Sequence, residues 1–309
     1  MGKEGNFSRT AVLLLAFGSP RSLDEVAAFL ERLMGKEPTA AHVADLQQRY
    51  QAVGGVSPLY ETTMQQAAAL ERALRGRGIP VPVFAGMRYS HPLIAETLDE
   101  IKKRDISSII PVSLSPYHSP ATEEYYAEVR RIWAARHKGR EIVQIADWHA
   151  HPLLCAAWAK RILEALGTTG GKKEAIPVIF TAHSLPIKVA ANSSYIKQLE
   201  ETIQGIIAKT GPLGWHLAFQ SKGRGRDDWL GPEPATILEG IFTEGHRQAV
   251  ICPIGFISDH LETLYDLDIV IKVWADKRGI EVSRIPCLNV APELIEVLVQ
   301  LVEGALGKT

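Results

Sequence analysis

The run AVLLLAF, residues 11–17, decides the fold class of this chain. Every position in it is apolar, which is typical of a strand that is buried on both faces of a parallel sheet. The run ends at GSP, residues 18–20, and a helical pattern follows from an expected N-cap at Ser22 to about residue 34. A buried strand followed by a helix is the repeating unit of open α/β sheets, so we predict an α/β fold.

The same alternation of strand-like and helical patterns recurs through both halves of the sequence. Strands separated by helices of about 10–15 residues favour right-handed βαβ units, so we expect two open parallel sheets of similar size. The Gly-rich stretch GTTGGKK, residues 167–173, is the expected linker between them. The expected strands are 11–17, 81–87, 108–114, 141–146, 176–181, 215–219, 248–256 and 281–286, and the expected helices are 22–34, 42–53, 62–75, 92–103, 122–136, 152–166, 193–209, 234–243, 259–277 and 292–306.

Composition narrows the class of protein. The chain has 309 residues, of which 46% are hydrophobic, so we expect folded cores in two domains or one large one. Its 34 basic and 35 acidic residues give a formal net charge of −1, so we expect no nucleic acid as a partner. The Gly-x-Gly-x-x-Gly pattern is missing after Phe17, which argues against a dinucleotide at the first turn.

The three cysteines, Cys155, Cys252 and Cys287, are far apart and form no CxxC motif. They fit a reducing, cytoplasmic setting and are too few for an iron–sulfur cluster, which needs about four ligands. The first ten residues are polar and lack the apolar core of a signal peptide. No apolar run reaches the ~18 residues of a membrane span, so we expect a soluble protein, with peripheral membrane contact left open.

Two ionisable residues stand where an α/β sheet presents groups to a ligand, which is beyond the carboxyl ends of its strands. His183 follows an apolar run, and its ordinary pKa near neutrality suits a proton acceptor or a metal ligand; the alternative is a histidine satisfied locally in a loop. Glu262 stands in the first turn of a helical pattern, where an acid also complements the helix dipole. We expect the two side chains to face each other across a cleft.

Further ionisable residues surround Glu262. Asp266 lies four positions on and is expected on the same helical face, whereas His260, two positions before, is expected to point elsewhere. A row of oxygen ligands at helical spacing is suited to passing a hydrated cation along the helix. The row belongs to a dense group of ionisable residues within ten positions, which comprises Asp259, His260, Glu262, Asp266 and Asp268.

Five motifs resemble the ferrochelatases, which insert ferrous iron into a porphyrin in haem synthesis. They occur in the same order over about the whole chain. The motifs are QRY at 48–50 with GGVSPL at 54–59, GMRYSHP at 86–92, AHSLP at 182–186, QSK at 220–222 with WLGP at 229–232, and SDHLETLYD at 258–266. The resemblance implies two Rossmann-like domains without a nucleotide, residues 1–166 and 174–309.

The resemblance also implies roles for single residues. The catalytic histidine and glutamate correspond to His183 and Glu262, with Asp266 as a third metal contact. A neutral His183 would accept a pyrrole proton, and Glu262 would stabilise the imidazolium or take the proton onward. Fe²⁺ is then a substrate, a porphyrin and haem are the bound partners, and no resident cofactor is expected. The implied substrate contacts are Phe17, Arg49, Ser57, Arg88, Tyr126 and Trp229.

Departures from the family pattern bear on the porphyrin. Phe17 stands where the coproporphyrin-using branch has a metal-ligating tyrosine, and Leu33-Met34 stands where that branch has a basic pair. Both changes resemble the protoporphyrin branch, whereas the short lip and the missing membrane-facing insert resemble the coproporphyrin branch. We therefore favour protoporphyrin IX slightly over coproporphyrin III. A chelatase for another metal such as cobalt, and a tetrapyrrole carrier or sensor without turnover, are the alternatives.

Overall fold

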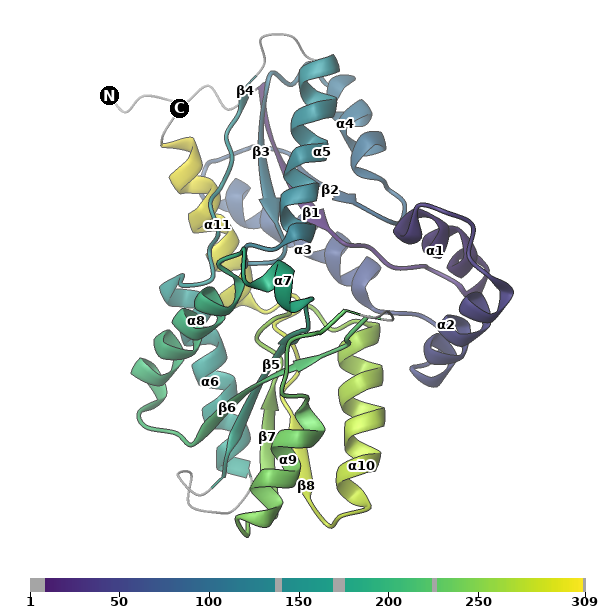
Figure 1. Cartoon of the computed structure of the whole chain (residues 1–309). Helices are drawn as coiled ribbons and strands as arrows, with labels where there is room; N and C mark the ends of the chain where they lie inside the picture. The colour runs from purple at the N-terminus through teal and green to yellow at the C-terminus, as the bar shows by residue number, and fades with distance from the viewer. Residues whose placement is uncertain (1–8, 137–140, 169–175, 224–226, 308–309) are drawn as a thin grey trace.

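The computed structural model describes residues 9–136, 141–168, 176–223 and 227–307. The strands are β1 Thr10–Ala16, β2 Val83–Met87, β3 Ser108–Ser113, β4 Glu141–Ile142, β5 Val178–His183, β6 Trp215–Gln220, β7 Gln248–Cys252 and β8 Glu281–Arg284. They form two parallel four-stranded sheets, one in each half of the chain (Figure 1). The order is β2-β1-β3-β4 in the first and β6-β5-β7-β8 in the second, so one topology occurs twice and the predicted fold class is confirmed.

The two halves correspond residue by residue at the carboxyl ends of their first strands, β1 and β5. Ala16 of β1 and Ala182 of β5 each pair with a residue of the neighbouring strand that donates its N–H to a proline carbonyl at 2.8 Å. Phe17 and His183 come next in the sequence. These two residues therefore occupy equivalent positions in the two halves.

Helices cover both faces of each sheet (Figure 1). They are α1 Val26–Met34, α2 Ala40–Ala52, α3 Leu59–Gly76, α4 Ile94–Lys102, α5 Pro120–Arg136, α6 Pro152–Thr168, α7 Ile187–Ala190, α8 Tyr195–Thr210, α9 Pro234–Thr243, α10 Lys272–Asp276 and α11 Pro292–Leu306, with a 3₁₀ turn η2 Leu23–Glu25 and a π-helix η4 Thr263–Ile271. Because side chains alternate along a strand, Leu13 of β1 joins the core under α4 and α5, whereas Leu14 joins the core under α3. In β5, Ile179 faces α9 and α10, and Phe180 faces α6 and α8.

One continuous apolar core joins the two halves. It contains Leu14 of the first sheet and Phe180 of the second, with fully buried side chains of α3, α6 and α11 between them, such as Leu70, Trp158 and Leu298. Helix α6 packs on α8 and β7 of the second half, and α11 returns to pack on α3 of the first (Figure 1). Helix α6, which precedes the second sheet in the sequence, therefore packs with the second half, and α11, which follows that sheet, packs with the first. The expected linker begins in the last turn of α6, and from residue 169 it lies outside the described residues.

The helix expected over residues 259–277 is two helices of different kinds. The π-helix η4 is followed directly by α10, and the pattern of apolar residues gave no sign of the change. The short helix α7, directly after Pro186, was also not expected. At the other elements the expected and observed ends differ mostly by a few residues; strand β7 ends at Cys252, before Pro253, which has no N–H to donate.

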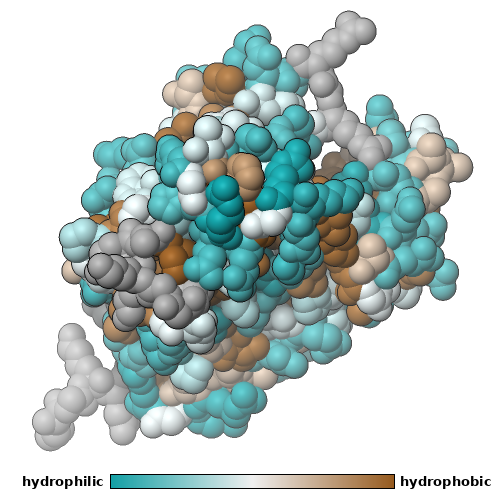
Figure 2. All heavy atoms as spheres, turned by 90° about the horizontal axis from the view of Figure 1, so that it is seen from below, coloured by the Kyte–Doolittle hydropathy of each residue, from teal (hydrophilic) through white to brown (hydrophobic). Residues whose placement is uncertain are grey.

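Figure 2 shows the molecule from below, at the end of the second half that lies farthest from the first. Hydrophilic residues cover most of this face, and apolar side chains are seen there in separate patches. Within the described part of the chain, no helix is long and apolar enough to cross a bilayer.

Candidate active site

A cavity of about 430 Å³ lies where the carboxyl ends of the two sheets meet. In both sheets the strand order reverses beside the first strand, and such switch points are where open α/β sheets bind ligands. The loops after β1, β3, β5 and β7 line the cavity, and α1 and α2 supply an apolar wall with Phe29, Leu30, Leu33, Leu46 and Tyr50. Its volume falls in the usual range for small-molecule sites, ~300–1,000 Å³.

His183 and Glu262 face each other in this cavity, as expected. Nε2 of His183 lies 3.5 Å from Oε1 of Glu262. Nδ1 of His183 lies 2.5 Å from the carbonyl oxygen of Ser184, so this nitrogen carries a proton and donates it. The ring is therefore aimed at the carboxylate by the backbone of the next residue.

The pair is charged. Burial disfavours the imidazolium of His183, but the Glu262 carboxylate and the Ser184 carbonyl outweigh burial and raise the pKa of His183 to about 9. Burial likewise disfavours the Glu262 carboxylate, but His183 and His260 outweigh it and hold the pKa of Glu262 well below its usual value. The expected neutral imidazole is thus an imidazolium near neutral pH, and His183 must lose a proton before it can accept one.

His260 is closer to the pair than expected. Its Nε2 lies 3.4 Å from Oε2 of Glu262, so the prediction that it points elsewhere was wrong. The reason is that His260 precedes the helix, where the spacing of side chains is not helical. The backbone N–H of His260 donates to Oγ1 of Thr263 at 3.0 Å, and its ring atom Nδ1 lies 3.2 Å from the carbonyl oxygen of Ser258. The Glu262 carboxylate therefore has a histidine at each oxygen.

Asp266 lies behind Glu262, away from the cavity lining. Oγ of Ser221 donates a short hydrogen bond to Oδ2 of Asp266. Burial and the neighbouring Glu262 raise the pKa of Asp266, and the Ser221 hydroxyl opposes this shift. Ser221 has a φ of 58°, a left-handed conformation that is costly for a residue with a side chain and that recurs at functional sites.

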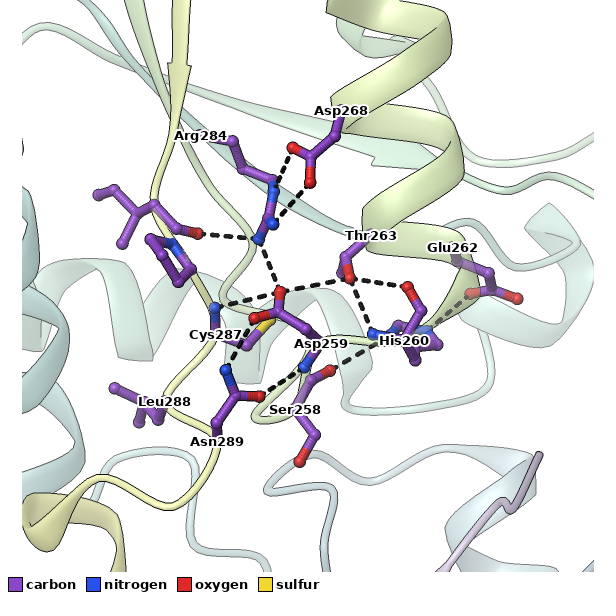
Figure 3. Close-up of polar contacts among 12 residues, drawn as sticks. Ser258, Asp259, His260, Glu262, Thr263, Asp268, Arg284, Cys287, Leu288 and Asn289 are labelled. Carbon is purple, nitrogen blue, oxygen red and sulfur yellow. Dashed lines mark hydrogen bonds and ion pairs between the residues drawn. The ribbon is translucent and has the colours of Figure 1, made fainter. Parts of the chain in front are cut away.

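The two remaining acids of the row, Asp259 and Asp268, serve the framework. Figure 3 shows both held by Arg284: Nη1 lies 2.7 Å from Oδ1 of Asp259, and Nε and Nη2 lie 2.5 and 2.7 Å from the oxygens of Asp268. Asp259 also accepts from Asn289 at 2.8 Å and from the N–H of Cys287 at 3.3 Å. Of the expected row, His260 and Glu262 line the cavity, and Asp259, Asp266 and Asp268 do not. Among the described residues, no group of three or more His, Cys, Asp and Glu side chains forms a closed metal site.

A glutamine from the first half ties this framework to the opposite sheet. Nε2 of Gln66, on α3, donates to Oγ of Ser258 at 3.0 Å and to the carbonyl of Asn289 at 2.6 Å. The Gln66 side chain is fully buried. The loop that carries His260 and Glu262 is therefore held from both halves of the molecule.

Two of the implied substrate contacts line the cavity. The ring of Phe17 is 38% exposed, and its centroid lies 4.7 Å from that of Tyr89 and 6.2 Å from that of Phe29. Ser57 is buried, and its hydroxyl accepts the N–H of Leu59 at 3.2 Å. The position of Phe17 confirms that the turn after β1 borders the cavity.

The other implied contacts do not line the cavity. Arg49 pairs with Asp45 at 3.2 Å, and its guanidinium lies 5.5 Å from the ring centre of Tyr265. Arg88 pairs with Glu128 at 2.6 Å. Trp229 forms an isolated antiparallel bridge with Pro186 after β5.

Tyr126 points into the core of the first half. Its hydroxyl accepts the N–H of Ser113 at 3.0 Å. Tyr125 lines the cavity instead, because neighbouring residues of a helix project in directions about 100° apart.

Sequence reasoning missed two residues that shape the site. The hydroxyl of Tyr195 donates to the carbonyl of His183 at 3.1 Å and helps to fix the end of β5. The backbone N–H of Gly255 donates to the carbonyl oxygen of Thr181 at 3.0 Å. A side chain at position 255 would not fit, because its Cβ would lie 2.6 Å from Cα of Ala182. A glycine inside the run expected as a strand, residues 248–256, was the available signal for such a close backbone approach.

The fold and the paired histidine and acid define a chelatase-like protein. A solved structure with this fold is "SirB from Bacillus subtilis with Fe3+", with a TM-score of 0.61, 13% identity, and coverage of 97% of this chain and 96% of that one. The ferrochelatase family model matches residues 9–306, and the chain belongs to the ferrochelatase family. Relatives include "Coproporphyrin III ferrochelatase" of Halalkalibacterium halodurans, 30% identical over 97% of this chain and 98% of the relative, and "Ferrochelatase" of Herpetosiphon aurantiacus, 34% identical over 96% and 99%. The protein is thus a lyase that inserts metal into a porphyrin.

Proposed function

We propose that this ferrochelatase inserts Fe²⁺ into protoporphyrin IX and that His183 and Glu262 handle the protons of the reaction. The observation that carries the proposal is the ion pair of these residues at the wall of an apolar cavity. Insertion replaces two pyrrole protons with one Fe²⁺, so two protons must leave for each haem formed. The pair supplies an acceptor and a route for them.

The charged state of the pair sets the order of events. At neutral pH, His183 holds a proton on each ring nitrogen, since its pKa is raised to about 9. A divalent cation arriving beside the pair disfavours the imidazolium, because a nearby like charge lowers the pKa of a cationic acid. Loss of the Nε2 proton, by way of Glu262 to His260 or to water, leaves Nε2 free to accept a pyrrole proton.

The lining of the cavity supports a dicarboxylic porphyrin. Among the described residues, none of those that line it is Lys or Arg, and most are apolar or aromatic. Protoporphyrin IX carries both propionates on one edge, so its opposite edge can be buried against apolar side chains while both propionates stay at one side of the cavity. Coproporphyrin III carries a propionate on each of its four rings, and burying one without a cation is costly. Ser57 at the wall and Arg49 on α2, once it is released from Asp45, are proposed to meet the propionates.

Coproporphyrin III is the second candidate, because the relative from Halalkalibacterium halodurans is named for that substrate. A rate comparison under anaerobic conditions, with Fe²⁺ and each porphyrin in turn, tests the choice. We expect a higher kcat/KM for protoporphyrin IX. The reverse order would favour coproporphyrin III, and binding of both without turnover would favour a carrier.

A further inference from the structure

Two acids of α5, Glu124 and Glu128, hold Arg88, the arginine of the GMRYSHP motif directly after β2. Nη1 of Arg88 lies 2.6 Å from Oε2 of Glu128, and Nη2 lies 4.0 Å from Oε2 of Glu124. The same Glu124 oxygen lies 3.4 Å from the hydroxyl of Tyr89. One guanidinium between two carboxylates leaves one net negative charge in this group. Arg88 is therefore not free to bind a propionate unless it leaves Glu128.

This acidic group stands directly behind an aromatic edge of the cavity, formed by Phe17, Tyr89 and Tyr125. Phe17 and Tyr125 line the cavity, and the Tyr89 ring packs against that of Phe17 with centroids 4.7 Å apart. Tyr125 lies between Glu124 and Glu128 in the sequence of α5. Tyr89 links the acids to this edge, because its hydroxyl contacts Glu124 and its ring packs against Phe17, which lines the cavity.

The two acids differ in exposure. The Glu128 side chain is 16% exposed and the Glu124 side chain 55%. Solvent screens Glu124 more strongly, while Glu128 acts through a low-dielectric wall. Together they make an aromatic edge that accepts apolar groups and repels anionic ones.

We infer that Glu124 and Glu128 determine specificity by excluding porphyrins that carry a propionate on the side facing the aromatic edge. Discrimination by repulsion is a common way to reject a ligand that otherwise fits. The inference rests on the proposed preference for protoporphyrin IX and names the groups that would produce it. Neither acid touches the reacting nitrogens, so their effect is on which porphyrin binds.

The test is the ratio of kcat/KM for coproporphyrin III to that for protoporphyrin IX, measured with the full chain and Fe²⁺. Glu124→Gln with Glu128→Gln should raise this ratio about tenfold, mainly through a lower KM for coproporphyrin III, as expected for removing repulsion at a partly screened site. Added salt should lower the wild-type KM for coproporphyrin III and have less effect in the double variant. Fluorescence titration of each porphyrin without metal should show the same change in relative affinity.

Glu123→Gln is the matched control. Glu123 lies on the same helix, is 51% exposed and pairs with Arg130 at 2.5 Å, so Glu123→Gln removes one carboxylate from an exposed ion pair, as the single variant Glu124→Gln does. We expect it to change the ratio by less than about twofold. Glu124→Gln alone keeps the half-buried Glu128–Arg88 pair and provides a variant that disturbs the fold least; it should raise the ratio by less than the double variant does.

The outcomes separate this inference from the proposed substrate. If the wild type prefers protoporphyrin IX and the double variant leaves the ratio unchanged, the two acids do not set specificity. If the wild type prefers coproporphyrin III, the proposed substrate is wrong, and a rise of the ratio in the double variant would still support repulsion. An unchanged ratio in that case would overturn both.

Discussion

The two walls of the cavity are held by different interactions. The loop of residues 254–262, the polar wall, is fixed by hydrogen bonds and ion pairs that converge on Asp259 and on Gln66. The apolar wall of α1 and α2 packs around a small cluster with Leu30 and Tyr50 at its centre. The difference agrees with the proposed function, in which proton transfer requires fixed positions of His260 and Glu262, whereas an apolar ring face requires only a surface of matching shape.

The largest expected effect is at the ion pair itself. His183→Ala should slow Fe²⁺ insertion by about a thousandfold, because removal of a positioned acid–base group typically costs 10²–10⁴ in rate. Porphyrin affinity, measured by fluorescence quenching, should change far less, since both walls remain. Normal turnover by this variant would show that another group accepts the pyrrole protons.

Substitutions in the polar wall should lower the stability of the protein most. Asp259→Ala leaves the Arg284 guanidinium, whose side chain is 11% exposed, short of a partner. Removing one member of a buried ion pair costs about 3 kcal/mol or more, so the free energy of unfolding in urea should fall by about that much. Lys272→Ala is the control: it breaks the Lys272–Asp276 pair on α10, 48% and 55% exposed, and should cost less than about 1 kcal/mol. Equal losses would mean that the network around Asp259 does not hold this wall.

Substitutions in the apolar wall should weaken the binding of the porphyrin. Leu30→Ala removes a buried side chain that lines the cavity, so we expect a loss of about 2 kcal/mol in stability and a higher KM for the porphyrin. Leu238→Ala on α9, fully buried and away from the cavity, should lower stability without raising KM. A KM that rises equally in both variants would attribute the effect to general loosening of the fold.

The smallest expected effect is a pH dependence that belongs to the pair. The pKa of His183 is raised to about 9 in the folded protein, so the folded state binds this proton more tightly than the unfolded state does. The resulting stability is fully present below the ordinary pKa of histidine, ~6.5, and is lost as pH rises through about 9. Because the His183 side chain is 35% exposed, we expect the loss to be only about 1 kcal/mol. Glu262→Gln removes the carboxylate that raises the pKa, so the difference in unfolding free energy between pH 6 and pH 9.5 should shrink; an unchanged difference would assign it to other groups.

The sequence patterns predicted the sheets and the central pair because these depend on local order. An apolar run and the residue that follows it were enough to place His183 at a strand end. What could not be predicted depends on contacts between distant segments. Asp259 and Arg284 are 25 residues apart, and nothing in the pattern near Asp259 indicates that it serves Arg284 and not a metal.

Other differences have a geometric cause. Tyr125 and Tyr126 are adjacent and identical in type, so only the rotation of α5 decides which of them reaches the cavity. His260 lies in the capping turn before η4, where a spacing of two residues does not place side chains on opposite sides. The crossing of α6 and α11 between the halves also depends on contacts between distant segments, since α6 packs on α8 and α11 packs on α3.

The equivalence of Phe17 and His183 has a consequence for the evolution of the site. A chain with two identical halves would present the same residue type at both of these strand ends, and both would offer the cavity the same chemistry. Here one copy of the position carries an apolar ring and the other an ionisable one. The two halves of the scaffold therefore present different chemistry at equivalent strand ends, with an apolar ring at Phe17 and an ionisable ring at His183.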